Sequence, residues 1–315
     1  MEKIKYFNKI INKAIKHYGY NEVIDEQKAF NNFLERYNFS FRNYKKNKYD
    51  FTNFIGNLRG YPYSTHILAK NLLFKNSERC WIYFERTALF WTMSHIADEW
   101  IDHIKNAFEY SLYVERKDLL NILIQKTLAY LNLEVYKNNK EHIKQQVYPS
   151  TQLIHFLVEK WLGNNPAKEK VLEFGKGYGI YQKLIDNWEN YNEIKSSYWD
   201  ELCEYHLNGI GVIKSESRES EEFLGSGLIP MELINLFKVR KELGLDIPKI
   251  NHEFFHTPFA TMPKIPTKYN ENFDIIYQMV KKTTETQKLH SAEEIISYVN
   301  QTYNSAENKN FFLIF

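Results

Sequence analysis

The sequence predicts an all-α fold, a multi-helix array of antiparallel helical hairpins around one central apolar helix. Three observations lead to this prediction. The stretch from Trp81 to Ile104 contains no Gly or Pro, and its apolar residues recur at three- and four-residue steps. The same helical spacing recurs in most other segments of the chain. No run of alternating β-branched residues is long enough to predict a sheet.

The central helix is expected over about 77–104, with Ser77 and Glu78 at its start. A second face of its first half is also apolar, through Trp81, Phe84 and Trp91. A helix that is apolar on two sides is normally enclosed by other helices. We therefore expect this helix to lie at the centre of the fold.

Composition limits the classes of partner and compartment. Of the 315 residues, 43% are hydrophobic, 25% are charged and 16% are aromatic, which is a globular composition with material for a large core. A net charge of +2 provides no general attraction to nucleic acid or to anionic membranes. There is no secretory signal pattern, and no apolar run approaches the ~18 residues that span a bilayer. We expect a cytoplasmic protein, with Cys80 and Cys203 as buried thiols.

The N-terminal half, residues 1–135, is expected to contain helices around the central one. Periodic apolar residues predict them over 3–18, 22–37, 65–75 (with Ser64 as a cap) and 116–133. Residues 38–62 are rich in aromatic residues, Asn and Lys, and are interpreted as turns. The polar stretch 134–150 is the best internal boundary, although we expect both halves to pack as one globular unit.

The C-terminal half, residues 150–315, is also predicted to be helical. Helices are expected over 151–162 (stopped by Gly163), 167–187, 191–207, 230–243, 271–286 and 291–303. The charged, Gly- and Ser-rich stretch 214–227 is the most loop-like in the chain. Four prolines prevent 246–268 from being one regular element.

A glycine-rich motif spans residues 171–179, with Gly175, Gly177 and Gly179 after Glu173. It resembles the cofactor loop of S-adenosylmethionine-dependent methyltransferases. That loop needs a strand before it and a second strand after it, whereas the residues that follow here are helical in pattern. The favoured interpretation is a helix over 167–187 in which the glycines let a neighbour pack closely.

Carboxylates cluster at the end of the central helix, at Asp98, Glu99 and Asp102. This arrangement resembles the aspartate-rich motif of class I terpenoid synthases, because carboxylates one turn apart can share Mg²⁺ ions that hold a diphosphate. The second metal-binding motif of that family is not present in 205–222. An Mg²⁺-dependent terpenoid synthase-like enzyme is therefore the alternative function.

Two further constellations are weaker. Glu253 and His256 have the Glu-x-x-His spacing of a di-metal site but lie between prolines. The basic group Arg42, Lys45, Lys46 and Lys48, interleaved with aromatic residues, is interpreted as a solvated loop rather than a nucleic-acid surface. The sequence thus predicts no catalytic residues, cofactor or metal.

One resemblance points to a function. The segment Asn192 to Pro263 contains a Tyr198-Trp199 pair, a variable loop, and Pro230-Met231-Glu232-Leu233 at the start of an apolar helix that ends before Pro248. It resembles the C-terminal part of the immunity protein 49 family of bacterial polymorphic toxin systems. That resemblance implies an immunity protein that binds and neutralises a cognate toxin by stoichiometric occlusion, without catalysis.

Acidic residues are the candidate toxin-binding groups, because they would complement a toxin with a basic cleft. One group belongs to the loop and the other to the end of the central helix: Glu216, Glu219, Glu221 and Glu222, and Asp98, Glu99 and Asp102. The loop is expected to be the more exposed. A non-catalytic helical adaptor with another partner is the second alternative, and the oligomeric state is left open.

Overall fold

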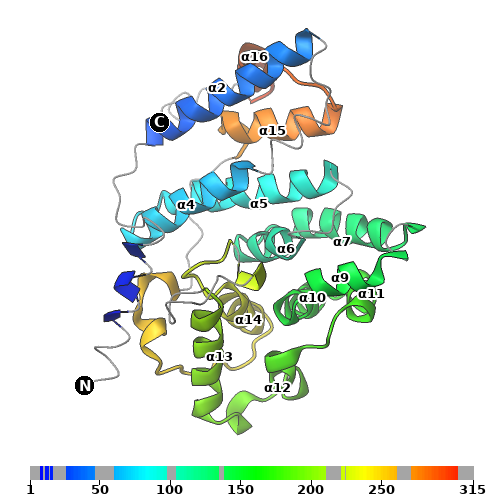
Figure 1. The fold of residues 1–315 in the computed structure, drawn as a ribbon. Coiled ribbons are helices and arrows are strands. Elements are labelled where there is room, and N and C mark those ends of the chain that lie inside the picture. The colour runs from blue at the N-terminus through cyan, green and yellow to red at the C-terminus, as the bar shows by residue number, and fades with distance from the viewer. Residues whose placement is uncertain are drawn as a thin grey trace.

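The computed structural model describes residues 8–9, 11–13, 15–16, 26–46, 60–97, 104–134, 138–210, 221–223, 225–260 and 271–303. Within these ranges the protein is all-α, as predicted, with thirteen α-helices, six short 3-10 helices and no strand (Figure 1). Helical residues also occur at 8–9, 11–13 and 15–16.

The α-helices lie on both sides of the predicted boundary. Those before the polar stretch 134–150 are α2 (Glu26–Lys45), α4 (Gly60–Phe74), α5 (Cys80–Ala97), α6 (Ile104–Tyr113) and α7 (Lys117–Leu131), and α9 (Lys140–Gln146) lies within it. Those after it are α10 (Pro149–Leu162), α11 (Ala167–Phe174), α12 (Gln182–Asp186), α13 (Ser196–Gly209), α14 (Met231–Glu242), α15 (Ile275–Thr286) and α16 (Ala292–Tyr303). The 3-10 helices are η1 (Gly179–Tyr181), η2 (Tyr191–Glu193), η3 (Glu221–Phe223), η4 (Glu253–His256), η5 (Pro258–Ala260) and η6 (Glu271–Phe273).

Helix α5 is the predicted central helix, and its position is confirmed. It contacts α4, α6, α7 and α15, and its side chains from Cys80 to His95 are buried except Ile82. It ends at Ala97, residues 98–103 lie outside the described ranges, and Ile104 begins α6. Consecutive helices contact each other at α4–α5, α5–α6, α6–α7 and α15–α16. Their antiparallel hairpin arrangement stays a prediction.

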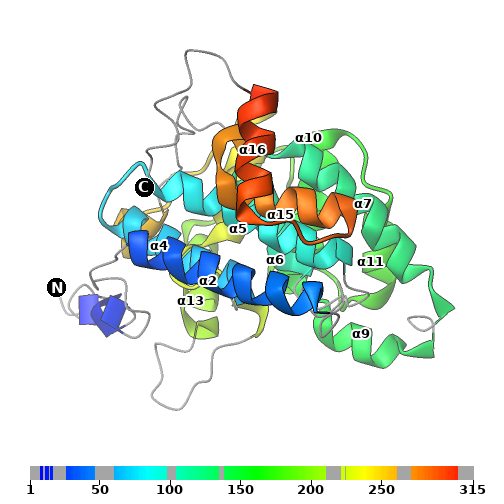
Figure 2. The same cartoon turned by 90° about the horizontal axis from the view of Figure 1, so that it is seen from above.

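The helices form successive layers. Helices α2, α15 and α16 lie over α4 and α5, and we call these three helices the outer layer (Figures 1 and 2). On the other side of α5 lie α6 and α7, which contact α10, α14 and α11. Contacts such as α6–α10 and α6–α14 join elements from both sides of the polar stretch 134–150.

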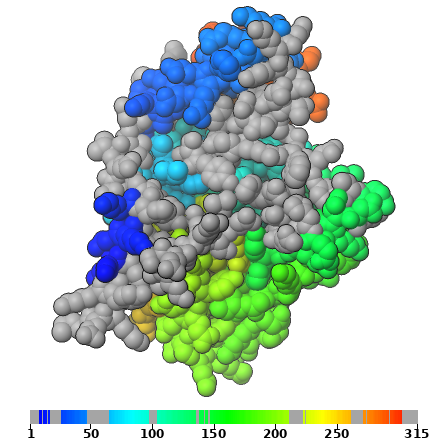
Figure 3. Space-filling view, in the orientation of Figure 1, coloured from blue at the N-terminus to red at the C-terminus, as the bar shows by residue number. Residues whose placement is uncertain are grey.

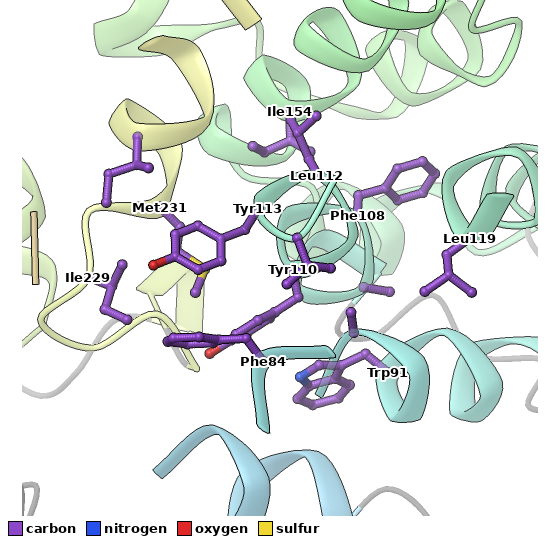
Figure 4. Close-up of a cluster of buried hydrophobic side chains, with 14 of the residues drawn as sticks. Phe84, Trp91, Phe108, Tyr110, Leu112, Tyr113, Leu119, Ile154, Ile229 and Met231 are labelled. Carbon is purple, nitrogen blue, oxygen red and sulfur yellow. The ribbon is translucent and has the colours of Figure 1, made fainter. Parts of the chain in front are cut away.

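Aromatic side chains fill the interface between α5 and α6 (Figure 4). Tyr113 stacks on Trp81 with ring centroids 5.8 Å apart and meets Phe84 edge-on at 5.0 Å. Ile229 and Met231, which come from a distant part of the sequence, lie beside this cluster (Figure 4). All of these side chains are buried, so a segment following the predicted loop reaches the centre of the core.

Residues 38–62 are not all turns, contrary to the prediction. Helix α2 continues to Lys45, because Tyr37, Ser40 and Phe41 extend its inward-facing stripe. Helix α4 begins at Gly60, before the predicted cap Ser64. Pro62 is compatible with this start, since the first turn of a helix needs no intrahelical N–H bonds.

The predicted helix over 167–187 is also wrong as one element, because it breaks at the glycines. Helix α11 ends at Phe174, and Gly177 and Gly179 take left-handed backbone angles, with φ of 80° and 51°. The expected close packing is present: a Cβ atom on Gly175 would lie 1.2 Å from the side-chain nitrogen of Gln152. No strand adjoins this motif in the described part of the chain, so the methyltransferase context is absent there.

Candidate functional site: a buried polar network around residues 225–230

The chain returns from the predicted acidic loop into the protein interior. Residues 211–220 lie outside the described ranges, η3 follows, and residues 225–230 are all buried. We call 225–230 the return segment. Gly225 and Gly227 have φ angles of 93° and 56°, a conformation that favours glycine. The expectation that the loop 214–227 is exposed is therefore wrong for this end.

Side chains of α4 and α6 bind the first two residues of the return segment. The Gly225 carbonyl accepts hydrogen bonds from the Lys70 ammonium and, at 2.7 Å, from the Tyr110 hydroxyl. The Ser226 hydroxyl donates to the Glu109 carboxylate at 2.8 Å, and Lys105 donates to the same carboxylate oxygen at 2.9 Å. Charged groups thus satisfy backbone and hydroxyl groups in the protein interior.

His206 connects the two helices that flank the loop. Its Nε2 lies 2.7 Å from the Gly227 carbonyl, and its Nδ1 lies 2.7 Å from the Glu232 carboxylate. A carbonyl only accepts hydrogen bonds, so Nε2 is the donor to the Gly227 carbonyl. His206 is on α13, before the loop, and Glu232 is in the first turn of α14, after it. This pair therefore fixes both helices to the return segment.

We use the name buried polar network for the charged and polar side chains that hold the return segment. Its members are Lys70, Lys105, Glu109, Tyr110, His206 and Glu232. Each is at most 6% exposed. Burial raises the pKa of Glu109, and the neighbouring Lys105 opposes that rise. Burial also raises the pKa of Tyr181, and the nearby carboxylates of Glu232 and Glu222 raise it further.

This chemistry supports a structural role for the network rather than acid–base catalysis. Both ring nitrogens of His206 are occupied, by a carbonyl and a carboxylate, so neither is available to a substrate. Glu109 is held by Lys105 and Ser226 and is fully buried. Paired buried charges of this kind specify one arrangement of the backbone. In this chain they position the end of the acidic loop.

The two ends of the loop also meet directly. The Phe223 ring lies so close to Gly209 that a Cβ on Gly209 would be 2.1 Å from a ring carbon. The same ring packs edge-on against His206, with centroids 4.7 Å apart. Gly209 is the last residue of α13, so residues 210–222 leave from and return to one place in the fold.

Of the acidic residues that the sequence grouped together, the structure describes the side chain of Glu222 alone. Glu222 is 4% exposed and accepts hydrogen bonds from the Ser150 backbone N–H, at 2.9 Å, and from the Tyr205 hydroxyl. It stabilises the N-terminus of α10, where a negative charge is favourable, and it does not lie on an exposed surface. Glu221 lies in η3, but its side chain is not described. Outside the described ranges are Glu216, Glu219, Asp98, Glu99 and Asp102.

The other candidate residues from the sequence do not form a reactive or metal-binding group in the described part of the chain. Glu253 and His256 lie in η4, a 3-10 turn, and Arg42, Lys45 and Lys46 lie at or just after the exposed end of α2, while Lys48 is not described. Cys80 and Cys203 are buried free thiols, and burial raises the pKa of Cys80 to about 12. Among the described residues, no three His, Cys, Asp or Glu side chains are grouped to hold a metal ion.

Sequence reasoning missed the members of this network. Lys105 and Glu109 are four residues apart on α6, a helix whose side chains are all buried, and Lys70 lies in the apolar α4. Charged residues within otherwise apolar helices were the only sequence feature that could have indicated buried, paired charges. His206 and Glu232 also lie on either side of the loop in the sequence, but nothing in their spacing predicts the contact between them.

Comparisons with known proteins add no assignment. No family model matches the chain, and no curated protein or solved structure is significantly similar to it. Of the helices in the described ranges, none is both long enough and apolar enough to cross a membrane.

Proposed function

We propose that this chain is a cytoplasmic immunity protein that binds one cognate bacterial toxin and occludes it stoichiometrically, without catalysis. The observation that carries the proposal is the fixation of both ends of the acidic loop by groups that are themselves buried and paired. A loop whose ends are held loses less conformational entropy on binding than a free loop. This proposal makes the loop the contact surface.

The charge pattern of the loop supports a basic partner surface. Glu216, Glu219 and Glu221 lie in sequence between the fixed ends, whereas Glu222 is used inside the fold. Acidic groups opposite a basic cleft accelerate association and disfavour other partners. We therefore propose that the first three residues contact the toxin and that Glu222, which is buried, does not. Asp98, Glu99 and Asp102 remain candidates from sequence alone.

The segment with the family resemblance is used to build this support. Trp199 packs against Tyr191 and Phe237, and Glu232 pairs with His206. A shared scaffold of this kind would be retained while the variable loop between α13 and α14 adapts to each toxin. This is consistent with an immunity role, in which specificity lies in a few exposed residues.

Co-expression with the protein encoded by the adjacent reading frame tests the proposal. Cells carrying that frame alone should stop growing, and this chain should restore growth and co-purify with the toxin at one-to-one stoichiometry. An inactive toxin point mutant serves as the control for expression burden. Absence of rescue, or rescue without a stable complex, would contradict the proposal.

A second assay addresses the enzyme alternative. The purified full chain is incubated with prenyl diphosphates and Mg²⁺, and released diphosphate is measured. The proposal predicts no release above background. Release that disappears in Asp98→Asn would replace the immunity assignment with a terpenoid synthase-like activity, and recovery of a non-toxin partner from cells would favour the adaptor.

A further inference from the structure

A cavity of about 160 Å³ lies between the outer layer and the helices beneath it. It is lined by residues of α2, α4, α5 and α15. Half of its lining residues come from α2, and this helix lies at the surface of the molecule (Figures 2 and 3). This cavity is separate from the buried polar network, with which it shares no residue.

The cavity has an apolar floor and a polar mouth. Phe33, Phe90 and Ile276 are buried at its floor, while Asn32 and Arg36 are exposed at its mouth. Phe33 and Phe90 stack almost parallel, with an interplanar angle of 3° and centroids 6.2 Å apart. The floor thus presents aromatic and aliphatic carbon to any group that enters.

The charges around the cavity are paired, with one exception. Arg86 forms a two-bond ion pair with Asp274, at 2.6 and 3.0 Å. Glu26 accepts hydrogen bonds from Arg79 and Tyr83. Arg36 makes no ion pair with any described residue, so the mouth carries one uncompensated positive charge.

We infer that this cavity binds a small aromatic carboxylate, with its ring on the floor and its carboxylate at Arg36. The volume is comparable to that of an engineered apolar cavity of about 150 Å³ that binds benzene, so it has room for one ring. A guanidinium presents paired N–H donors that match the geometry of a carboxylate. A cationic ligand would instead place its charge beside Arg36.

The cavity is independent of the immunity proposal, because it is a different site for a different kind of ligand. Its ligand would also stabilise the contact of α2 with α4, α5 and α15, since all four helices line the cavity. Binding to the folded state alone raises the unfolding temperature by mass action. Ligand binding can therefore be measured both by the NMR signals of the ligand and by the rise in the unfolding temperature of the protein.

The test uses ligand-observed NMR and thermal unfolding of the full chain with benzoate, benzyl alcohol and benzylamine. Benzoate is expected to bind with an affinity at least about fivefold higher than that of benzyl alcohol, and benzylamine to bind weakest, since a charge-assisted hydrogen bond is stronger than a neutral one. No detectable binding of benzoate in the millimolar range, or equal affinities for all three probes, would overturn the inference.

Three variants locate the site. Arg36→Gln should remove the preference for benzoate over benzyl alcohol and retain weak binding of both. Ala29→Phe, which adds a ring at the cavity wall, should abolish binding of both probes with unchanged helical content by circular dichroism. The control Arg42→Gln removes an arginine on the same helix, outside the cavity, and should bind benzoate like the wild type. Retained benzoate preference in Arg36→Gln would overturn the inference.

Discussion

Around the return segment, charged groups are enclosed: Lys105 and Glu109 are 6% and 0% exposed and 2.9 Å apart. Arg79, the residue before α5, forms an ion pair with Glu26 of α2 at a similar distance of 2.8 Å, but its side chain is 43% exposed and that of Glu26 is 22% exposed. Distance is therefore a poor guide to what a pair contributes. Removal of one buried partner leaves a charge without water, whereas an exposed partner is readily solvated. We expect loss of a partner in the buried polar network to lower stability strongly, and loss of the exposed Arg79–Glu26 pair to be tolerated.

The largest effect is expected from Glu109→Ala. This change leaves the Lys105 ammonium buried without its carboxylate and removes the acceptor of Ser226, so it should lower the free energy of unfolding by about 3–5 kcal/mol. Urea unfolding measures it. The control Glu141→Ala breaks the exposed pair with Lys144 and should cost less than about 0.5 kcal/mol. Similar losses in both variants would remove the distinction between buried and exposed ion pairs.

Gly209→Ala should have an intermediate effect. The added methyl group would meet the buried Phe223 ring, which must shift from its place between His206 and the end of α13. Overpacking of this kind costs about 1–3 kcal/mol. Gly163→Ala is the matched control, because that glycine has a φ of 77° but open space around it, so only backbone strain is expected there. Slower unfolding or greater stability in Gly209→Ala would contradict the proposed contact.

Stability should also depend on pH through Glu85, on α5. Burial raises the pKa of Glu85 to about 7, and the carboxylates of Glu271 and Asp118 add to the rise while Arg116 opposes it. The folded protein thus holds a proton that the unfolded chain releases between pH 4.5 and 7, so stability falls as pH rises through that window. Between pH 5 and pH 8 the free energy of unfolding of the wild type should fall by about 1–2 kcal/mol more than that of Glu85→Gln, as measured by urea unfolding at each pH. Parallel pH profiles would show that Glu85 does not titrate in this range.

The smallest effect is expected from Arg79→Gln. It removes the ion pair with Glu26 of α2, but Tyr83 still donates to Glu26, and both charges are partly exposed. The free energy of unfolding, measured in urea, should change by less than about 1 kcal/mol. A loss as large as that of Glu109→Ala would mean that α2 is held by charge rather than by its aromatic contacts with α5.

Much of the helical fold was predictable because, in long segments, the positions of Gly and Pro and the spacing of apolar residues indicate the same helix boundaries. Helix α5 lacks Gly and Pro, and α10 ends at Gly163, which takes the left-handed conformation expected of a helix C-terminus. The break after Phe174 was not predicted, because glycines are tolerated in helical patterns. The structure shows why they are needed: Gly175 packs against Gln152, and Gly177 and Gly179 take left-handed backbone angles.

The candidate site was less predictable than the fold. Glu222 cannot be distinguished by sequence from Glu216 or Glu219, since all three are charged residues in a Gly- and Ser-rich stretch. Its burial depends on the position of Ser150 and Tyr205, which are distant in sequence. Lys70 and Lys105 likewise contact the return segment, more than one hundred residues away. Such contacts follow from tertiary packing and leave no local pattern.

The most direct measurement for the central claim, that a loop held by buried charges binds the toxin, is calorimetric titration of toxin with the double variant Glu216→Lys/Glu219→Lys. We predict at least tenfold weaker binding with an unchanged unfolding midpoint. The control Glu169→Lys/Glu173→Lys makes the same charge change at exposed positions on α11 and should bind within about twofold of the wild type. Wild-type affinity in the loop variant, or equal weakening in both variants, would contradict the claim.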